Sequence, residues 1–452
     1  ATYNSSTGKI TFEVTADDIV NPIQIKVTIG TDVPAGSRLE PEIVKGATTT
    51  SDDISVAICD DSALMRNLIS RVVDETEGMS VIGKAMNGQF LVDKLALFKP
   101  DVIILDIEMP VMTGIEFLKW RKQNKVDIPV IILSSIAEKG AAVTIECLEL
   151  GAVDFITKPN GSISADISSV SDRLIELIAS YGGSYARRHG KIVRGNDFYS
   201  KLGSDRLVER KLTTALGKEK AQEFLSSSKD KASSAPVASN FGSMDSKTPA
   251  VIEPLRKPGK IEVIAIGIST GGPNALRDVF KMIDPHLKQP VLVVQHMPAG
   301  FTKEFANSLN KICALNVKEA EDNEPIVGGT VYIAPGNYHI YVEQTALGKK
   351  MLRLSQEPQR NGHRPSADVL FESVAKIYQN RALGVIMTGM GKDGAVELAE
   401  MRKQGAWTLG QDEASSIVYG MPKVAFELGG VQKQVSLEKM ADEISKLARE
   451  NA

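Results

Sequence analysis

The chain has 452 residues, of which 42% are hydrophobic and 24% are charged, and its formal net charge is −3. This length and composition are typical of a globular protein with two or three hydrophobic cores and exclude a wholly disordered chain. Because the charges nearly balance, no global basic field would attract nucleic acid or an anionic membrane, and we expect neither as a partner.

The cysteines and the apolar runs bear on the compartment. Cys59, Cys147 and Cys313 are odd in number and far apart, each in an apolar or helical stretch, which favours small buried hydrophobes in a reducing compartment. No run approaches the roughly 18 apolar residues that cross a bilayer, and the amino terminus lacks the basic-then-apolar layout of a signal peptide. We therefore expect a cytoplasmic protein without a transmembrane segment.

The first segment, residues 1–53, is predicted to be β-rich, with short strands at 10–14 and 23–29 separated by Asn and Pro. It begins with Ala rather than Met and contains a Gly-Ser-Arg-Leu-Glu stretch at 36–40. Two origins stay open, an expression or fusion remnant and a native accessory segment. No function is predicted for it.

Residues 54–183 alternate strands with helical periods. The helices are expected near 62–77, 88–98, 114–124, 139–150 and 166–180, and the strands are SVAICDD, VIGKA, DVIILDIEMP, PVIILSS and DFITKP. Strands that alternate with helices predict an α/β fold with a doubly wound parallel sheet, which binds ligands at the carboxyl ends of its strands.

The rest of the chain divides into a linker and a second domain. Residues 184–260 have a basic start, one expected helix at 205–226, and then a stretch dominated by Ser, Ala and Pro, which is typical of a linker. Residues 261–452 resume the alternation with VIAIG, VLVVQHMP, TVYIAPG, LGVIMTGMG and AWTLGQ as the clearest strands. A second doubly wound parallel-sheet domain is predicted there.

Polar residues follow the strands of the first domain. Asp60 and Asp61 follow its first strand, Asp106 follows DVIIL, and Ser134 and Lys158 end two later strands. Parallel strands share one rim, and three carboxylates gathered there repel one another unless a hard divalent cation lies between them, so the cluster predicts Mg²⁺. Taken singly, Asp61 as a helix cap and Lys158 as a surface lysine are the simpler interpretations.

The joint spacing Asp-Asp, Asp-x-x-Met-Pro, Ser-Ser and Lys-Pro resembles the response-regulator receiver family, a flavodoxin-like fold, over about residues 54–180. The resemblance implies that Asp106 accepts a phosphoryl group from a histidine kinase. It also implies that Asp61, Asp106 and the Glu108 carbonyl bind Mg²⁺, with Asp60 acting through water.

The same resemblance assigns switch residues. Lys158 would pair with a phosphoryl oxygen, and Ser134 would hydrogen-bond it after a shift that Phe155 accompanies. The added charge of about −1.5 to −2 is enough to reorganise such a loop. Family members carry a cis peptide at the position of Lys158-Pro159. Thr113 stands where the family commonly has Asp, which should alter the turn rather than the chemistry.

In the second domain, Gly-Ile-Ser-Thr-Gly at 267–271 closes an apolar strand and opens a helical segment. Such a strand-to-helix turn exposes a serine at the sheet rim beside backbone N–H groups that can hold an oxyanion, which makes Ser269 a candidate nucleophile. Alone the pattern is weak, because similar turns occur as plain loops or phosphate cradles.

A serine hydrolase also needs a base and an orienting acid on that rim. Of the five histidines, His296 ends the next strand, whereas His189 in the linker and His286 in an Asp-Pro-His turn are expected to be solvated. Asp393 lies in a glycine-dense loop after LGVIM. A plain Asp-Gly turn, or an exposed pair with Lys392, is the alternative for that acid.

The motifs G-I-S-T-G-G-P, Q-H-M-P-x-G-F, Y-I-A-P-G, H-R-P-S-x-D-V-L-F and M-T-G-M-G-K-D-G-A resemble the chemotaxis protein-glutamate methylesterase family, CheB, over about residues 261–440. That family places a receiver ahead of the catalytic domain. The resemblance implies that Ser269 attacks glutamate γ-methyl esters of methyl-accepting chemoreceptors, that His296 is the base, and that Asp393 fixes the imidazole.

Further properties follow from the resemblance. Backbone N–H groups near Thr270 and Met390 would hold the oxyanion, and His363 and Arg364 would form the wall that faces the substrate. Lys392 departs from the Asn frequent in this loop, which puts local side-chain contacts in doubt. Glutamine deamidation is implied as a second activity, ester hydrolysis would need no cofactor, and a monomer is expected. Phosphorylation of Asp106 would weaken a receiver contact that covers the hydrolase rim.

Two rival functions are less favoured. A dinucleotide-binding domain would need G-x-G-x-x-G and an acidic residue after the second strand, whereas this chain has G-x-S-x-G-G and Gln-His-Met-Pro. A non-catalytic platform for receptor tails does not require the Ser, His and Asp that are all present.

Overall fold

The computed structural model describes residues 53–134, 138–158, 166–195, 198–199 and 249–452, together with four short strands nearer the amino terminus. These strands are β1 (Thr2–Asn4), β2 (Lys9–Thr11), β3 (Gln24–Lys26) and β4 (Glu42–Val44). They pair antiparallel as β1 with β2 and β3 with β4, within a compact unit that spans residues 1–53. The expected helix at 205–226 and the peptide bond before Pro159 lie outside the described residues.

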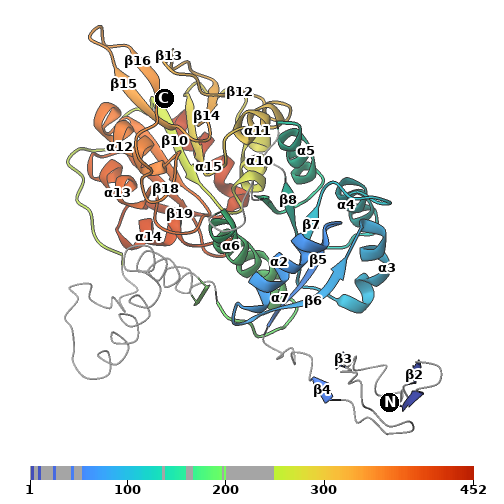
Figure 1. Ribbon diagram of the computed structural model, residues 1–452. Helices are drawn as coiled ribbons and strands as arrows, with labels where there is room; N and C mark the ends of the chain where they lie inside the picture. Colours follow the sequence, from blue (N-terminus) through green and yellow to red (C-terminus); the bar gives the residue numbers. More distant parts are fainter. Residues whose placement is uncertain are drawn as a thin grey trace, which may run out of the picture. The chain divides into compact units, whose positions relative to one another are not determined.

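The first α/β domain has a parallel sheet in the order β6-β5-β7-β8-β9 (Figure 1). Its strands are β5 (Ile54–Cys59), β6 (Met79–Ala85), β7 (Val102–Asp106), β8 (Val130–Ser134) and β9 (Asp154–Thr157). Its helices are α2 (Ala63–Asp74), α3 (Gly88–Phe98), α4 (Gly114–Gln123), α5 (Glu138–Glu149), α6 (Asp166–Leu177) and α7 (Gly183–Arg188). The predicted doubly wound sheet is confirmed.

The last helical stretch of this domain differs from the expected single helix. After α6 the backbone widens into a π-helical turn, η1 (Ile178–Gly182), before α7. A Cβ at Gly182 would stand 2.8 Å from Ile54 and 2.9 Å from Val102, so a glycine is needed for this turn to pack closely on the sheet.

The second α/β domain has a parallel sheet in the order β12-β14-β11-β10-β17-β18-β19. Its strands are β10 (Val263–Ile268), β11 (Val291–Gln295), β12 (Asn316–Glu319), β14 (Thr330–Ile333), β17 (Ala382–Ile386), β18 (Trp407–Gln411) and β19 (Lys433–Val435). A separate antiparallel sheet joins β13 (Glu324–Pro325), β16 (Lys350–Ser355) and β15 (His339–Gln344). The helices are α10 (Gly272–Met282), α11 (Phe301–Asn310), α12 (Ala367–Tyr378), α13 (Ala395–Lys403), α14 (Met421–Glu427) and α15 (Leu437–Glu450).

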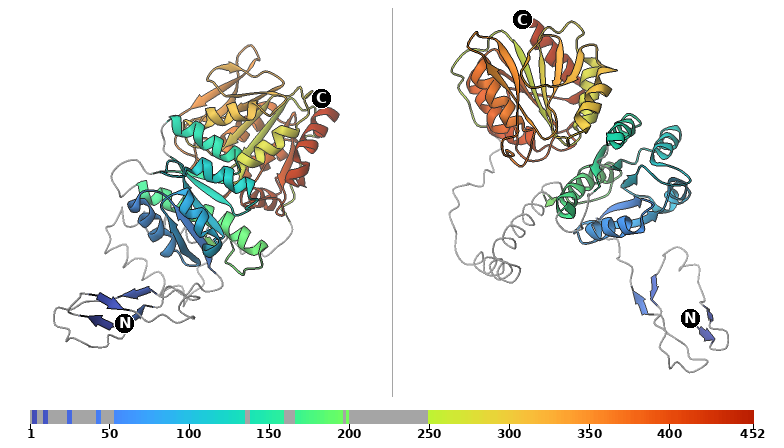
Figure 2. Two further views of the ribbon diagram at one scale, coloured as in Figure 1. Left: turned by 90° about the vertical axis from the view of Figure 1, so that its right-hand side faces the viewer. Right: turned by 45° about the horizontal axis from the view of Figure 1, so that its top comes forward.

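Helices cover both faces of this sheet (Figure 2). Alternate residues of β10 point to opposite sides, so that Ile264 packs in a core with Leu276 of α10, and Ala265 in a core with Phe371 of α12. The buried strands therefore read as continuous apolar runs. Among the described residues, none of the helices has the length and apolarity needed to cross a bilayer.

The strand order places a ligand site after β10. This strand pairs in parallel with β11 on one side and with β17 on the other. The order in which strands are added to the sheet therefore reverses at β10. In open parallel sheets such a switch point leaves a crevice at the carboxyl ends of the strands. The segments that carry the candidate Ser, His and Asp all begin there.

Candidate active site

Ser269 occupies a tight turn between β10 and α10. Its backbone N–H donates to the Thr388 carbonyl at 3.0 Å, and its own carbonyl accepts from the Gly272 N–H at 2.8 Å. Gly271, with φ of +81°, makes the left-handed turn that starts α10. A Cβ at Gly389 would stand 2.8 Å from the Ser269 Cβ, so the loop after β17 approaches the serine as only glycine allows.

The three candidate residues form a hydrogen-bonded chain. His296 Nδ1 lies 3.0 Å from Ser269 Oγ, and His296 Nε2 lies 2.8 Å from Asp393 Oδ2. All three side chains are largely buried. The sequence positions therefore meet with the distances that a nucleophile, a base and an orienting acid require.

The roles of the ring nitrogens follow from Asp393. Its carboxylate accepts hydrogen bonds from Ser366 Oγ at 2.6 Å, the Ala367 N–H at 2.7 Å and Asn361 Nδ2 at 2.9 Å. Burial alone would raise the pKa of Asp393, but the hydrogen bonds from His296, Ser366 and Asn361 outweigh it and hold that pKa well below its usual range. An ionised carboxylate only accepts, so His296 Nε2 carries the hydrogen and Nδ1 is left to accept from Ser269.

This orientation of the ring is opposite to that in chymotrypsin, where Nε2 faces the serine. The cause is the position of the histidine in the sheet. The His296 backbone N–H donates to the Ile268 carbonyl at 3.2 Å, which holds the histidine beside the adjacent strand. The ring nitrogen nearer the backbone therefore meets Ser269, and the farther one reaches Asp393, which follows β17 on the other side of β10.

The other candidate residues of this domain lie at the same rim. His363 stacks on His296, with ring centroids 3.8 Å apart and planes at 13°. The Arg364 guanidinium donates to Asn337 Oδ1 at 2.7 Å and to the carbonyls of Gln356 at 2.8 Å and Glu357 at 3.0 Å, so it ties neighbouring loops together.

Met390 and Lys392 follow Gly389 in the loop beside the serine, with Met390 half-buried and Lys392 exposed. Asn361 and Ser366, which hold Asp393, were missed by the sequence reasoning. Ser366 lies within the H-R-P-S motif, so a signal existed for it. No spacing pointed to Asn361.

In the first domain the acidic cluster is assembled as expected. Oxygen atoms of Asp60, Asp61 and Asp106 lie within 4.8 Å of one another, and Lys158 Nζ lies 2.7 Å from Asp106 Oδ2 and 3.2 Å from Asp60 Oδ2. Asp60 is fully buried, and burial raises the pKa of Asp106 in spite of Lys158. Three carboxylates gathered at one rim, with a single lysine to balance them, fit a hard divalent cation.

The remaining receiver candidates surround this cluster. Glu108 lines a cavity of about 210 Å³ together with Asp61, Asp106 and Lys158. Ser134 Oγ lies 2.5 Å from Thr144 Oγ1 of α5, so its hydroxyl is engaged with that helix. Thr113 caps α4 through a capping box with Glu116, so the residue that departs from the family pattern supports a regular turn.

Phe155 is directed at the second domain. Its ring stacks on that of Phe301, the first residue of α11, with centroids 4.7 Å apart. Phe301 is fully buried and follows the loop that begins at His296. The aromatic switch candidate of one domain therefore packs directly on the domain that carries Ser269.

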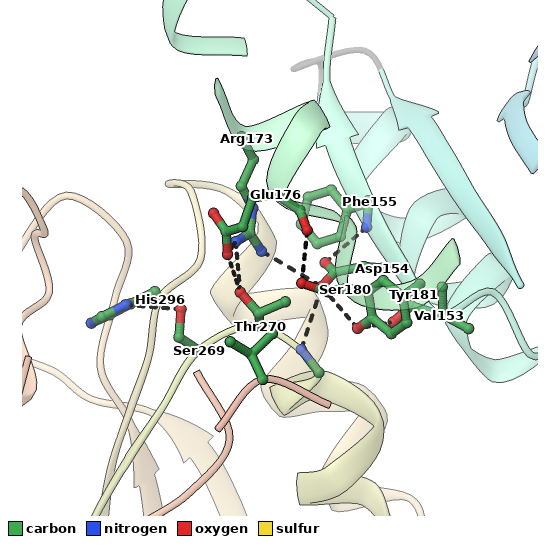
Figure 3. A network of polar contacts seen from close by, with 12 residues as sticks. Val153, Asp154, Phe155, Arg173, Glu176, Ser180, Tyr181, Ser269, Thr270 and His296 are labelled. Atoms are coloured by element: carbon green, nitrogen blue, oxygen red, sulfur yellow. Dashed lines mark hydrogen bonds and ion pairs between the residues drawn. The ribbon is translucent and has the colours of Figure 1, made fainter. Parts of the chain in front are cut away.

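The first domain also contacts the turn that carries Ser269 (Figure 3). Thr270, the residue after the serine, donates from Oγ1 to Glu176 Oε1 at 2.5 Å and accepts from Arg173 Nη1 at 2.7 Å. Arg173 also forms an ion pair with Asp154 at 3.5 Å, and Asp154 Oδ2 lies 3.5 Å from the Gly271 N–H. Two carboxylates and an arginine of the first domain thus surround the turn that carries Ser269.

A second patch extends this interface along α10 and α11. Ser308 Oγ donates to Glu149 Oε1 at 2.5 Å, Arg277 pairs with Glu149 at 3.5 Å, and Asn274 Nδ2 donates to the Ala152 carbonyl at 3.1 Å. The triad opens on a cleft of about 370 Å³ that residues of both domains line. Ser269 is only 5% exposed where it lines this cleft.

Comparison with known proteins gives two family matches. The model described as CheB methylesterase matches residues 264–444, and the response regulator receiver domain matches residues 56–165. A Treponema denticola protein named protein-glutamate methylesterase/protein-glutamine glutaminase is 51% identical over 402 residues, which cover 89% of this chain and 100% of that protein. A Treponema pallidum protein of the same name is 49% identical over 88% of this chain and 98% of its own.

Among solved structures, the Thermotoga maritima CheB methylesterase catalytic domain is 37% identical, with a TM-score of 0.40 over 42% of this chain and 98% of that domain.

Proposed function

Because the chain belongs to the CheB family of protein-glutamate methylesterases, with a response-regulator receiver ahead of the catalytic domain, we propose that Ser269, His296 and Asp393 catalyse its hydrolysis of glutamate γ-methyl esters in chemoreceptors. The observation that carries the proposal is the hydrogen-bonded chain from Ser269 Oγ through His296 to Asp393. The relatives' names pair this esterase with a glutaminase. We assign both reactions to the same three residues.

The mechanism follows from the tautomer that Asp393 imposes. Ser269 Oγ attacks the γ-carbonyl carbon while its proton passes to His296 Nδ1, and the imidazolium that forms is stabilised by Asp393 at Nε2. Collapse of the tetrahedral intermediate breaks the bond to methoxide, which takes the proton from His296 and leaves as methanol. Water then attacks the acyl-enzyme with His296 again as base, releasing glutamate and restoring the serine.

The oxyanion is stabilised at the start of α10 and by the loop beside it. The Thr270 backbone N–H and the N–H of Met390 are the donors we assign, with the helix dipole adding favourable potential. Loss of one such donor typically costs about 10²–10³ in rate. His363 and Arg364 border the cleft in which the substrate would lie.

Glutamine deamidation uses the same acyl-enzyme, with ammonia in place of methanol as the leaving group. Protonation by His296 matters more for this reaction, because an amide nitrogen leaves only after it has been protonated. Ester hydrolysis is therefore the easier of the two reactions at this site.

Phosphorylation would occur at Asp106, with a chemotaxis histidine kinase as the donor. Asp61, Asp106 and the Glu108 carbonyl would hold Mg²⁺, with Asp60 acting through water, and the ion would neutralise charge on the phosphoryl group during transfer. Lys158, now paired with Asp106, would pair with a phosphoryl oxygen, and Ser134 would turn from Thr144 toward it. Phe155 would move with Ser134 and so disturb its stack on Phe301.

The contacts at the interface support an inhibitory role for the unphosphorylated receiver. Glu176 and Arg173 bind the side chain of the residue next to the nucleophile, and Glu176 has the same side chain as the product of the reaction. Weakening these contacts would open the cleft to a receptor. We place this soluble activity in the cytoplasm, in a monomer with no nucleic-acid partner.

The proposal is tested by methanol release from a methylated receptor. Ser269→Ala should abolish release, whereas Ser355→Ala, which removes a hydroxyl from the antiparallel sheet, should retain it. If Ser269→Ala released methanol at a rate within about tenfold of the unmodified chain, the assignment of the nucleophile would be wrong.

A further inference from the structure

The loop from Arg360 to Ala367 touches the triad from two directions. Asn361, Ser366 and the Ala367 N–H hydrogen-bond Asp393 from its edge, while His363 covers one face of the His296 ring. Base and acid are therefore held by a single segment of the chain.

The backbone fixes where the His363 ring lies. Arg360 and His363 exchange both backbone hydrogen bonds, at 3.1 Å and 3.0 Å, which closes the loop into a tight bridge. Asn361 inside this bridge and Ser366, three residues after His363, both hydrogen-bond Asp393. The ring is thus placed by the same framework that places the acid, and it has little freedom to leave the stack.

We infer that His363 is a positioning residue for the general base: its ring lies flat on the imidazole of His296 and keeps that imidazole in the plane joining Ser269 to Asp393. The inference rests on the proposed esterase function. It adds a role to the expectation that His363 forms part of the wall facing the substrate.

The geometry separates this role from that of a second base. Imidazole nitrogens donate and accept in the plane of the ring, so two rings stacked at 13° do not direct a nitrogen at each other. His363 therefore cannot take a proton directly from His296. Burial and the neighbouring His296 lower the pKa of His363 to about 3, so it stays neutral while His296 becomes cationic during the reaction.

A neutral ring helps in two ways. The His363 ring blocks rotation of the His296 ring away from its hydrogen bonds to Ser269 and Asp393. Misalignment of a catalytic group can cost about 10²-fold in rate. The π-face of His363 also attracts the imidazolium that forms as Ser269 attacks, in the manner of a cation–π contact. A cationic side chain at position 363 would oppose the same step.

The test compares His363→Ala with His363→Phe in the full chain. Removing the ring should lower kcat about 10- to 30-fold and leave KM within about twofold, whereas Phe, which retains a flat neutral ring, should stay within about threefold of the unmodified kcat. Glu357→Ala, an exposed change in the preceding turn, serves as the control for the loop.

A second readout avoids the substrate. A fluorophosphonate forms an Oγ–P bond with the serine and releases fluoride, a reaction that needs the base but none of the receptor contacts. His363→Ala should slow this labelling by about the same factor as kcat. A raised KM with normal labelling, or a Phe variant as slow as Ala, would overturn the inference. Failure of the unmodified chain to release methanol while it still labels would instead count against the proposed substrate.

Discussion

At the scale of residues, the buried carboxylate of Asp393 determines which ring nitrogen of His296 carries the hydrogen. Asp393 is buried and accepts from Ser366, Asn361 and the Ala367 N–H as well as from His296. These donors stabilise the charge that directs the proton of His296 to Nε2. Because the hydrogen is on Nε2, Nδ1 keeps a lone pair that can accept the proton of Ser269.

Asp393→Asn should therefore lower kcat by about 10⁴-fold, the size seen for the equivalent change in a serine protease triad. An amide can donate to Nε2, which moves the proton to Nδ1 and leaves nothing to accept from Ser269. Methanol release measures the loss. Asp368→Asn, a neighbouring buried acid that does not contact His296, should lose far less, and equal losses in the two variants would contradict the assigned role.

Ser366→Ala removes one hydrogen bond to a buried charge, and such bonds contribute about 1.5–3 kcal/mol. The folded pKa of Asp393 lies below its unfolded value, so its stabilisation is present above about pH 4 and is lost as the pH falls through the folded pKa. The variant should unfold at lower urea concentration at pH 7. The difference from the unmodified chain should shrink below about pH 4, and a difference independent of pH would argue against this source.

Sequence reasoning reached the triad but not its supports. Ser269, His296 and Asp393 each follow an apolar strand, and parallel strands bring such residues to one rim. Asn361, which donates to Asp393, lies in a loop whose path depends on tertiary packing. Neither hydrophobic periodicity nor turn residues in the sequence predict that path.

At the scale of elements, helix α6 supplies the side chains of the first domain that contact Thr270, the residue after Ser269. The helix was predicted from its period, yet its two charged contacts to Thr270 were not, because they join side chains from separate domains. The change from α6 to η1 was also missed, since it reflects the close approach of Gly182 to the sheet. The strands at the centre of both sheets were predicted correctly because their burial makes them continuous apolar runs.

Glu176→Ala should raise the basal esterase rate several-fold, because Thr270 Oγ1 loses its acceptor and the receiver loses one anchor beside the serine. Glu146→Ala, on an exposed part of α5, is the matched control and should leave the basal rate unchanged. Methanol release without a phosphodonor measures both. A Glu176→Ala rate no higher than that of the control would mean that this contact does not limit access.

At the scale of the whole molecule, the proposed regulation requires that the acidic rim of the first α/β domain control access to Ser269 in the second. The stack of Phe155 on Phe301 and the contacts of Glu176 and Arg173 with Thr270 give two physical links between them. The order of domains and their motifs were readable from the sequence through resemblance to two families. The docking of one domain on the other was not, because it depends on surface side chains without a periodic signal.

We propose that Ser269 is a nucleophile whose access depends on Asp106, and one measurement tests this proposal most directly. Methanol release from a methylated receptor is followed with the full chain and with Asp106→Asn, each with Mg²⁺ and with or without a small-molecule phosphodonor. The account predicts that the phosphodonor raises the rate of the unmodified chain at least tenfold and leaves Asp106→Asn at its basal rate. Equal rates for the unmodified chain with and without phosphodonor would contradict it.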